Sequence, residues 1–98
     1  MAYYCYMVRC ANGAYYTGWT KDPLRRVNEH NAGQGARYTR IYGPVELVYV
    51  EEVEDHSTAL KRENQIKRYS HARKASLAGE NPLPEGFVPS DDAIGVEP

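Results

Sequence analysis

The 98-residue sequence lacks the features that would place a chain in a membrane or cross-link it covalently. It has no apolar run near the roughly 20 residues that a membrane-spanning helix needs, so we expect no membrane association. Its only cysteines, Cys5 and Cys10, are too few for a disulfide framework or a cysteine-rich zinc site. Because they lie five residues apart in one expected strand, their side chains should point to opposite faces, and we expect no disulfide between them.

Signal-peptide features are scarce as well. The apolar N-terminal segment, residues 1–8, has neither a basic leader nor a small-residue cleavage site. The chain length is suited to one domain with a single modest core. We therefore expect a reduced, cytoplasmic, single-domain protein.

An excess of one charge sign is also missing, since 12 Lys and Arg stand against 13 Asp and Glu, for a net charge of −1. The charges are unevenly distributed, however. Residues 1–78 contain all 12 basic residues and 8 acidic ones, whereas residues 79–98 contain five acidic residues, no basic residue and four of the six prolines. An acidic, proline-rich segment without apolar periodicity is typical of disorder. We therefore predict a folded domain over residues 1–79 and a disordered tail over residues 80–98.

Basic residues of the predicted domain are concentrated in residues 9–40 and 61–74, with six in each stretch. Residues 46–55 between them carry five acidic residues and no basic one. A solvated face is the ordinary meaning of such runs. If the fold brings both basic stretches to one side, they form a surface for a polyanion, so a nucleic-acid partner stays open.

Residue patterns predict three strands. Residues 3–10 and 15–19 are rich in aromatic and β-branched residues and flank Asn12-Gly13, a strong hairpin signal. Residues 45–53 form a third strand, in which Leu47 and Tyr49 are two positions apart and are therefore expected to share one face.

Capping signals delimit three helices. Asp22 followed by Pro23 predicts a helix start, and Gly33 marks where that helix has stopped. Ser57 and Ser70 are the expected N-caps of two further helices. The three predicted helices cover residues 23–31, 58–69 and 71–79.

The connection between the first helix and the third strand carries turn residues. Residues 33–44 contain three glycines and one proline without a helical period, so we predict a loop. The resulting element order is β-β-α-β-α-α. It predicts an α+β fold, in which helices flank a three-stranded antiparallel sheet.

The hairpin register decides whether two tyrosines can share a site. A two-residue turn at Asn12-Gly13 would place Tyr6 and Tyr16 on opposite faces of the sheet. A three-residue loop of residues 11–13, with Gly13 left-handed, would place both on one face. We predict the second register, because a joint phenolic site requires it.

Glu63 breaks the apolar pattern of its helix. It lies between Ala59, Leu60 and Ile66 on the helical wheel, in the stripe that should face the sheet. An unpaired carboxylate buried there would cost several kcal/mol as a rough figure. One explanation is an i,i+4 ion pair with Lys67. The other is an inward-facing general base or metal ligand, since magnesium takes carboxylate oxygen and keeps several waters.

Arg26 and His30 share one face of the first helix, four residues apart, at the edge of the apolar stripe. Arg25 points away from that stripe and has Glu29 at i+4. An exposed helix with an Arg25–Glu29 pair is one interpretation. The alternative is a phosphate clamp built on the bidentate fork of Arg26.

Basic and aromatic residues lie close together in residues 33–44. Arg37 and Arg40 lie beside Tyr38 and Tyr42, and glycines surround them. This mixture suits a surface that follows a nucleic-acid backbone, although the glycines match neither a Walker A motif nor a dinucleotide fingerprint.

Two short motifs carry a family resemblance. Tyr4-Cys5-Tyr6, followed after nine residues by Tyr16-Thr17-Gly18, resembles the paired motifs that name the GIY-YIG nucleases, with Tyr4-Cys5 standing where Gly-Ile is usual.

Three further positions extend the resemblance. Arg26 falls where the family has its catalytic arginine, and His30 matches the frequent His or Tyr position one turn later. Residues 60–67 resemble the helix that bears the metal-binding glutamate, here Glu63. The match covers about residues 3–70. The compact length and the sequence of residues 33–40 look most like the small stand-alone members, the YhbQ-like group.

The resemblance implies a metal-dependent phosphodiesterase. One Mg²⁺ or Mn²⁺ on Glu63 would hold the scissile phosphate and stabilise the leaving oxygen. Tyr6 would act as the general base on water, with Tyr16 assisting. Arg26 would stabilise charge on the phosphoryl group, and His30 would position water or phosphate.

The resemblance also implies partners. DNA or another nucleic acid would be the substrate, contacted by basic and aromatic residues that comprise Arg25, Arg37, Tyr38, Arg40 and Lys67. We expect a structure- or damage-directed DNA nuclease of low sequence specificity, or one targeted by a protein partner, as a monomer or weak dimer.

Two positions depart from the family pattern. Ala75 stands where many members have Asn, and Trp19 stands where some have Lys. A catalytically weak or inactive nucleic-acid-binding module is therefore the alternative.

Overall fold

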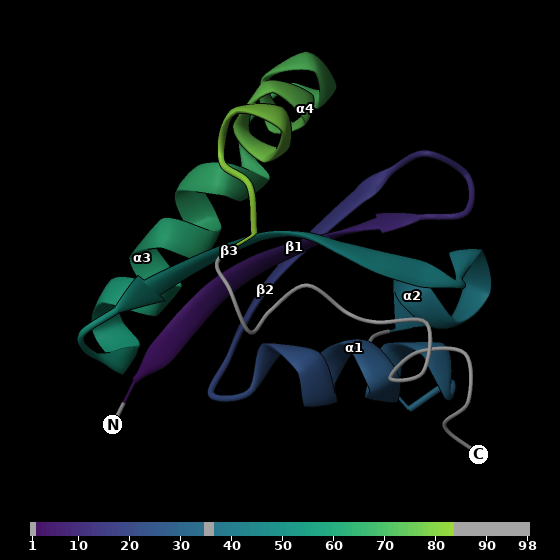
Figure 1. Ribbon diagram of the computed structural model, residues 1–98, viewed down its shortest axis with the longest axis horizontal. Coiled ribbons are helices and arrows are strands. Elements are labelled where there is room, and N and C mark those ends of the chain that lie inside the picture. The colour runs from purple at the N-terminus through teal and green to yellow at the C-terminus, as the bar shows by residue number, and fades with distance from the viewer. Residues whose placement is uncertain (1, 35–36, 84–98) are drawn as a thin grey trace.

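Three antiparallel strands form one sheet in the order β2-β1-β3 (Figure 1). The structure is a computed structural model and describes residues 2–34 and 37–83, without the side chains of residues 38–40. The strands are β1 (Tyr3–Cys10), β2 (Tyr15–Thr20) and β3 (Val45–Val53). The helices are α1 (Pro23–Asn31), α2 (Arg37–Tyr42), α3 (His56–Lys67) and α4 (His71–Glu80). The predicted α+β class and antiparallel sheet are confirmed.

The β1–β2 hairpin adopts the register that a three-residue loop produces. Gly13 has a φ of 87°, the left-handed conformation that glycine adopts without a steric penalty. Tyr6 lies opposite Gly18, and Val8 lies opposite Tyr16. Because Tyr6 and Val8 are two residues apart on β1, Tyr6 and Tyr16 share a face, as predicted.

Strand β3 departs from the predicted alternation. Met7 pairs with Tyr49 and Val8 pairs with Leu47, so Val48 is an extra residue that forms a β-bulge. The bulge shifts the side-chain parity, and Leu47 and Tyr49 pack in clusters on opposite faces of the sheet. The expectation that they share one face was therefore wrong. A register shift against β1 leaves no mark on the residue types of β3.

Helix α1 begins and ends as predicted. The Asp22 carboxylate accepts a hydrogen bond from the Arg25 N–H at 3.3 Å, and Pro23 occupies the first turn. Gly33, with a φ of 81°, follows the helix. The pairing of Arg25 with Glu29 is also present, at 3.3 Å.

Residues 37–42 form helix α2, so the prediction of a loop over residues 33–44 was wrong. The helix has only six residues, too few for a clear helical period, and its described side chains, Arg37, Ile41 and Tyr42, are all exposed. A tertiary contact holds its last turn, because the Tyr42 carbonyl accepts a hydrogen bond from the Ala11 N–H at 2.9 Å.

The start of α3 also differs from the prediction. Asp55, rather than Ser57, is the N-cap, and its carboxylate accepts a hydrogen bond from the Thr58 N–H at 2.7 Å. The helix therefore starts two residues earlier than predicted and ends at Lys67. Ser70 caps α4 as expected, and α4 extends one residue beyond Gly79.

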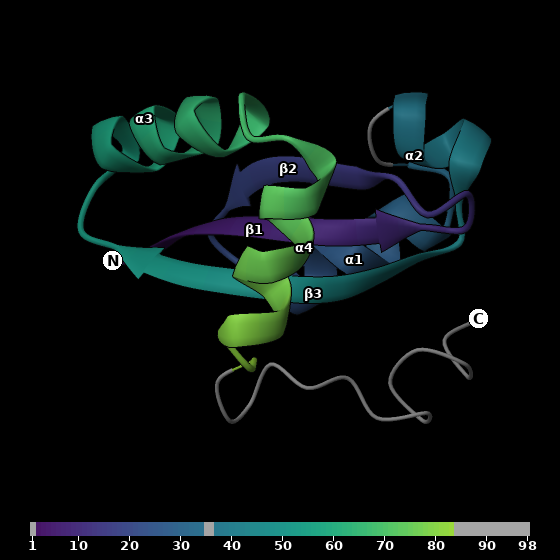
Figure 2. The same cartoon turned by 90° about the horizontal axis from the view of Figure 1, so that it is seen from above.

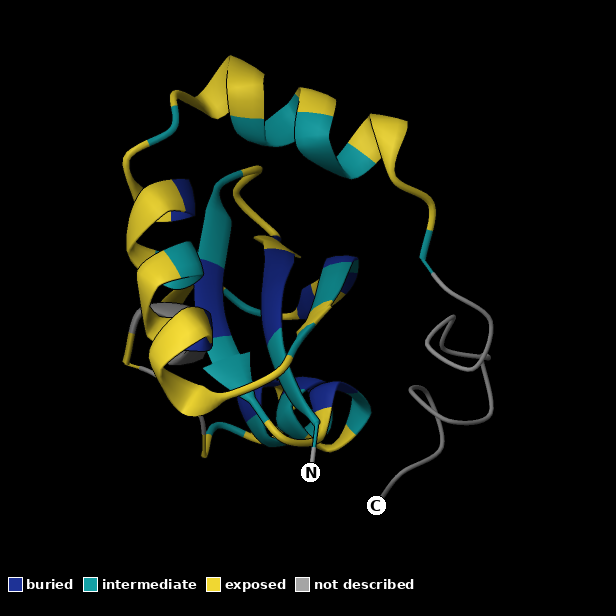
Figure 3. Cartoon of the chain, turned by 90° about the vertical axis from the view of Figure 1, so that its left-hand side faces the viewer, coloured by how far each residue is buried: buried dark blue, intermediate teal, exposed yellow. Residues whose placement is uncertain are grey.

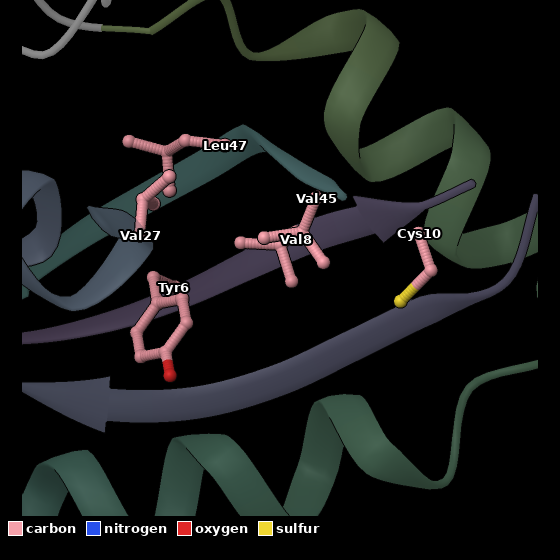
Figure 4. Packing of buried hydrophobic residues seen from close by; sticks show 6 residues of the cluster. All are labelled: Tyr6, Val8, Cys10, Val27, Val45 and Leu47. Carbon is pink, nitrogen blue, oxygen red and sulfur yellow. The ribbon is translucent and has the colours of Figure 1, made fainter. Parts of the chain in front are cut away.

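The helices cover both faces of the sheet, with α1 on one side and α3 and α4 on the other (Figures 1 and 2). Figure 3 shows the buried positions on the strands and on the sheet-facing sides of the helices. The cluster facing α1 comprises Tyr6, Val8, Cys10, Val27, Val45 and Leu47 (Figure 4). The cluster facing α3 and α4 comprises Cys5, Met7, Tyr49 and Ile66. Both cysteines are free and lie in different clusters, as predicted.

A polar network fastens α3 to the sheet. The Arg62 Nε donates to a Glu51 carboxylate oxygen at 2.9 Å, and the Tyr49 hydroxyl donates to the same oxygen at 2.6 Å. Arg62 also donates to the Tyr69 hydroxyl at 3.2 Å. The network fixes how α3 lies over β1 and β2, and therefore where Glu63 is held. Within residues 2–34 and 37–83, no helix has the length and apolarity needed to cross a membrane.

The chain after α4 returns to the opposite face. Leu77 and Ala78 pack on the cluster that faces α3 and α4, whereas Leu83 packs on the cluster that faces α1. Residues 81–83 therefore pass the β3 edge of the sheet (Figure 2). The expected tail of residues 80–98 contributes Glu80 to α4 and Leu83 to the core, and residues 84–98 lie outside the described part.

This packing predicts a difference between two truncations. A chain ending at Leu83 keeps the apolar contact, and a chain ending at Gly79 loses it together with the last turn of α4. We expect the shorter chain to be less stable by about 1–2 kcal/mol, the scale of one partly buried leucine. Urea unfolding of both truncations measures this difference. Equal midpoints would show that Leu83 adds nothing to stability.

Candidate active site

A buried hydrogen bond joins the middle of β1 to the end of α1. The Tyr6 hydroxyl and the His30 Nε2 atom are 2.8 Å apart. Tyr6 is 1% exposed and His30 is 2% exposed. The periodicity of α1 turns His30 toward the sheet on the same side as Val27. The two side chains are therefore held rigidly between strand and helix.

Gly18 provides the space for the Tyr6 ring. A Cβ atom at Gly18 would lie 2.7 Å from the Tyr6 hydroxyl oxygen and 2.9 Å from the ring carbon Cζ. Both distances are shorter than ordinary van der Waals contact, so only glycine accommodates the ring in this position. The glycine of the second motif therefore has a packing role that sequence reasoning alone did not assign.

Burial keeps both members of the pair neutral at pH 7. It lowers the pKa of His30 to about 4, and the positive charge of Arg26 adds to this effect. Burial also raises the pKa of Tyr6 to about 12, against a hydrogen bond from Arg26 that lowers it, while the Glu63 carboxylate raises it further. A neutral phenol and a neutral imidazole therefore share one hydrogen bond.

Arg26 lies between this pair and solvent. Its side chain is 31% exposed, and its Nη1 donates to a Glu29 carboxylate oxygen at 2.9 Å. The hydrogen bond to Glu29 raises the pKa of Arg26, and the hydrogen bond to Tyr6 adds to this. Sequence reasoning paired Glu29 with Arg25 only, although the i,i+3 spacing to Arg26 was the available signal.

Tyr16 contacts the ring of His30. The two rings are in an edge-on arrangement, with centroids 5.5 Å apart and an interplanar angle of 68°. The structure therefore brings Tyr6, Tyr16, Arg26 and His30 together on the α1 side of the sheet.

Glu63 lies on α3, which covers the other side of the sheet (Figure 1). Its side chain is 13% exposed, and its carboxylate lies 3.4 Å from the Lys67 ammonium nitrogen. The ion pair expected from the i,i+4 spacing is present. The carboxylate is close enough to the β1 strand to raise the pKa values of Cys5 and Tyr6, although burial is the larger cause for both. Glu63 therefore faces the sheet side, as its helical position predicted.

A cleft opens beside Arg26. Its volume is about 490 Å³, and it lies where β2 passes into α1. The lining residues are Trp19, Thr20, Lys21, Asp22, Arg25, Arg26 and Glu29. The cleft gives a ligand access to a guanidinium that contacts the buried pair.

The remaining predicted binding residues are distributed differently. Arg25 lines the cleft, with a side chain that is 75% exposed. Lys67 is engaged by Glu63, and Arg37 is exposed at the start of α2. Helix α2 lies toward the C-terminal end of α1 (Figure 1). Tyr38 and Arg40 belong to α2, but their side chains lie outside the described part.

The donor set for a metal ion is small. Within the described residues, no group of three or more His, Cys, Asp or Glu side chains converges on a metal position. A closed structural site is therefore not formed there. A single, mostly buried carboxylate whose partner is a flexible lysine fits a magnesium-type ion, which keeps several waters and takes substrate phosphate as a further ligand. Glu63 is the residue that would hold it.

The space at Gly18 gives a stability prediction. We expect Gly18→Ala to destabilise the fold by about 1–3 kcal/mol, because the added methyl group displaces the Tyr6 ring from its position beside His30. Urea unfolding measures the loss. In a Tyr6→Phe background the nearest clashing atom is absent, so the same substitution should cost less. An equal cost in both backgrounds would refute the contact as its cause.

The buried imidazole gives a pH prediction. The unfolded chain binds a proton at His30 below about pH 6.5 and the native state only below about pH 4, so stability falls as pH drops through this window. The full difference is roughly 3 kcal/mol, at about 1.4 kcal/mol per pKa unit. His30→Gln should flatten the dependence of urea unfolding on pH between pH 6.5 and 4.5. Substitution of the exposed His71 by Gln is the control, and an unchanged slope in His30→Gln would contradict the prediction.

Comparison with known proteins identifies the family of the chain. The model of the GIY-YIG catalytic domain matches residues 2–76. A UPF0213 protein of Staphylococcus aureus is 48% identical over 79 residues, which is 81% of this chain and 96% of the relative. The UPF0213 protein SSP2268 of Staphylococcus saprophyticus is 49% identical over 78 residues, or 80% and 95% of the two chains.

Solved structures give the same result. The solution NMR structure of the UPF0213 protein BH0048 from Bacillus halodurans superposes with a TM-score of 0.54 at 36% identity, over 86% of this chain and 89% of that one. The protein EF2693 from E. faecalis gives a TM-score of 0.55 at 35% identity, over 82% and 85%. The family that Tyr6, Gly18, Arg26 and Glu63 suggested is thus confirmed, and the chain belongs to the GIY-YIG nuclease family, among its small UPF0213 members.

Proposed function

We propose that the protein hydrolyses phosphodiester bonds of DNA with the help of one divalent cation, as a structure- or damage-directed nuclease of low sequence specificity. The observation that carries the proposal is the buried Tyr6–His30 hydrogen bond, contacted by Arg26 at the edge of an open cleft. Membership of a nuclease family and a nearby Glu63 support it.

Tyr6 cannot act as a free phenolate, because its pKa is raised to about 12 by burial. The hydrogen bond to His30 offers another route. The Tyr6 hydroxyl can donate its proton to the His30 Nε2 atom while the Tyr6 oxygen accepts a proton from the attacking water. The net result is that one proton moves from the water to the imidazole, and Tyr6 is protonated before and after. The oxygen of that water then forms a bond to phosphorus, and the bond from phosphorus to the leaving oxygen breaks.

Substrate binding favours this transfer. In the free protein the pKa of His30 is low because of burial and the charge of Arg26. A phosphate bound to Arg26 would offset that positive charge and add negative charge near the imidazole. Both changes raise the proton affinity of His30. The base would therefore become effective when the substrate is in place.

Arg26 and Glu63 would act on the phosphoryl group. Arg26 is held by Glu29 and remains 31% exposed, so its other donors can bind phosphate oxygens as charge develops on them. A divalent cation held by Glu63 would supply Lewis-acid stabilisation of the leaving oxygen. Mg²⁺ and Mn²⁺ both suit one carboxylate with waters.

One observation favours the alternative, a nucleic-acid-binding module without catalysis. Glu63 is already paired with Lys67, so its burial has an explanation that needs no metal ion. Ala75, at the position where many family members have Asn, lies on α4 and removes a further polar group. In this alternative the protein would bind DNA through its basic residues but leave it intact.

Glu63→Gln separates the two functions. With single-stranded, double-stranded and flap DNA in Mg²⁺ or Mn²⁺, we expect the wild type to cleave and Glu63→Gln to lose at least about 100-fold in rate, because its amide holds a cation poorly. Gel-based cleavage assays measure this, and circular dichroism checks that the variant is folded.

Glu52→Gln is the matched control, since Glu52 is exposed on β3 and should leave the rate unchanged. Equal cleavage by wild type and Glu63→Gln would refute the role of Glu63 and point to a contaminating nuclease. DNA binding without cleavage in either metal would support the inactive module.

A further inference from the structure

Three aromatic rings meet beside the cleft. The rings of Trp19 and His56 have centroids 4.4 Å apart, and Tyr3 lies 6.1 Å from Trp19 and 5.9 Å from His56. They come from β2, the first residue of α3 and the first residue of β1. The Lys21 ammonium lies 5.3 Å from the centre of the Tyr3 ring. We call Tyr3, Trp19 and His56 the aromatic cluster.

The aromatic cluster is not part of the buried core. None of its members belongs to either of the two buried clusters, and Trp19 and Tyr3 are only partly buried while His56 is exposed. Large aromatic side chains that remain accessible beside a polar cleft are common in binding sites. Core packing therefore does not account for the position of these rings.

Trp19 connects the aromatic cluster to the candidate active site. It lines the same cleft as Arg26, and Lys21 and Arg25 line that cleft too. An aromatic face beside several cations is the combination that binds single-stranded nucleic acid. Nucleobases stack on the aromatic rings, and phosphates pair with the Lys and Arg side chains.

We propose that Trp19 is a stacking platform for an unpaired nucleobase next to the phosphate held at Arg26. The proposal rests on the proposed nuclease function and specifies its substrate class. A base inside a duplex has both faces covered by its neighbours, and exposing one costs unstacking energy. For a base in a single-stranded extension or at a branch, this unstacking energy is small. The preferred substrate is therefore DNA with unpaired nucleotides at the cut site.

The surroundings of Trp19 suit such a platform. His56 and Tyr3 pack against its ring and restrict its rotamers, so less side-chain entropy is lost when a base stacks. Asp55 caps α3 and holds the start of that helix, and with it His56, in place. Tyr3 and His56 are therefore positioning residues, and Trp19 is the residue that would contact the base.

Trp19 is the sole tryptophan of the chain, so its fluorescence reports on the proposed contact directly. We propose titrating full-length Glu63→Gln, which should cleave far more slowly than the wild type, with single-stranded, flap and blunt duplex DNA of equal length. The expected result is saturable quenching by single-stranded and flap DNA and little quenching by blunt duplex. A matched flap with an abasic nucleotide at the junction should quench less.

Variants of Trp19 test the energetic role. In fluorescence anisotropy with labelled flap DNA, Trp19→Ala should bind about 10-fold more weakly, in line with the usual contribution of one stacked base. Trp19→Phe retains a ring and should lose much less. Both variants are first checked for folding by thermal unfolding, and a misfolded Trp19→Ala leaves the fluorescence titration and Trp19→Phe as the deciding measurements.

The outcomes separate the two proposals. Tight binding of flap DNA with no change in tryptophan fluorescence, and equal affinity of Trp19→Ala, would overturn the stacking platform while leaving the nuclease function intact. Absence of DNA binding in the anisotropy measurement would overturn both. Quenching of equal size by blunt duplex would show that Trp19 contacts the backbone and does not select unpaired bases.

Discussion

The hydrogen bond between Tyr6 and His30 is the interaction on which the candidate site depends. It forms only if several independent conditions are met together. Gly13 must adopt a left-handed conformation so that the hairpin register places Gly18 opposite Tyr6, and Gly18 must lack a side chain so that the ring fits. Asp22 must start α1 in the phase that turns His30 inward. Gly13, Gly18 and Asp22 are each a weak signal alone, but all three are needed for this one contact. This shared requirement explains why they occur together.

The same burial that makes this contact rigid also keeps it unreactive in the free protein. A phenol with a pKa near 12 and an imidazole with a pKa near 4 do not exchange a proton spontaneously at neutral pH. Arg26 is the group that links them to solvent, because it contacts Tyr6 and borders the cleft. A ligand that changes the charge at Arg26 therefore changes the proton affinity of the pair. This coupling is electrostatic and requires no movement of the backbone.

Much of the fold could be predicted because it depends on local signals. The positions of the three strands, the start of α1 and the free cysteines follow from spacing and capping, and the hairpin register followed once a shared tyrosine site was assumed. The bulge at Val48 could not be predicted, since it arises from pairing with β1. Helix α2 has six residues, too few to show periodicity. Asp55 was missed as a cap because Ser57 offered the same signal two residues later. Glu29 pairs with Arg25 as predicted, but its second pair, with Arg26, was missed.

The two acidic residues near the site differ in what their partners allow. Glu29 holds Arg26, whose guanidinium has five N–H donors. This ion pair therefore orients the guanidinium and leaves other donors for a phosphate. Glu63 holds Lys67, an ammonium on a flexible stem that is 48% exposed, at the longer distance of 3.4 Å. The Glu63 carboxylate would hold a divalent cation in place of that ammonium, since such a cation carries twice the charge. The released Lys67 would then be free to meet the phosphate backbone, so the ion pair that explains Glu63 in the resting protein is compatible with its proposed role.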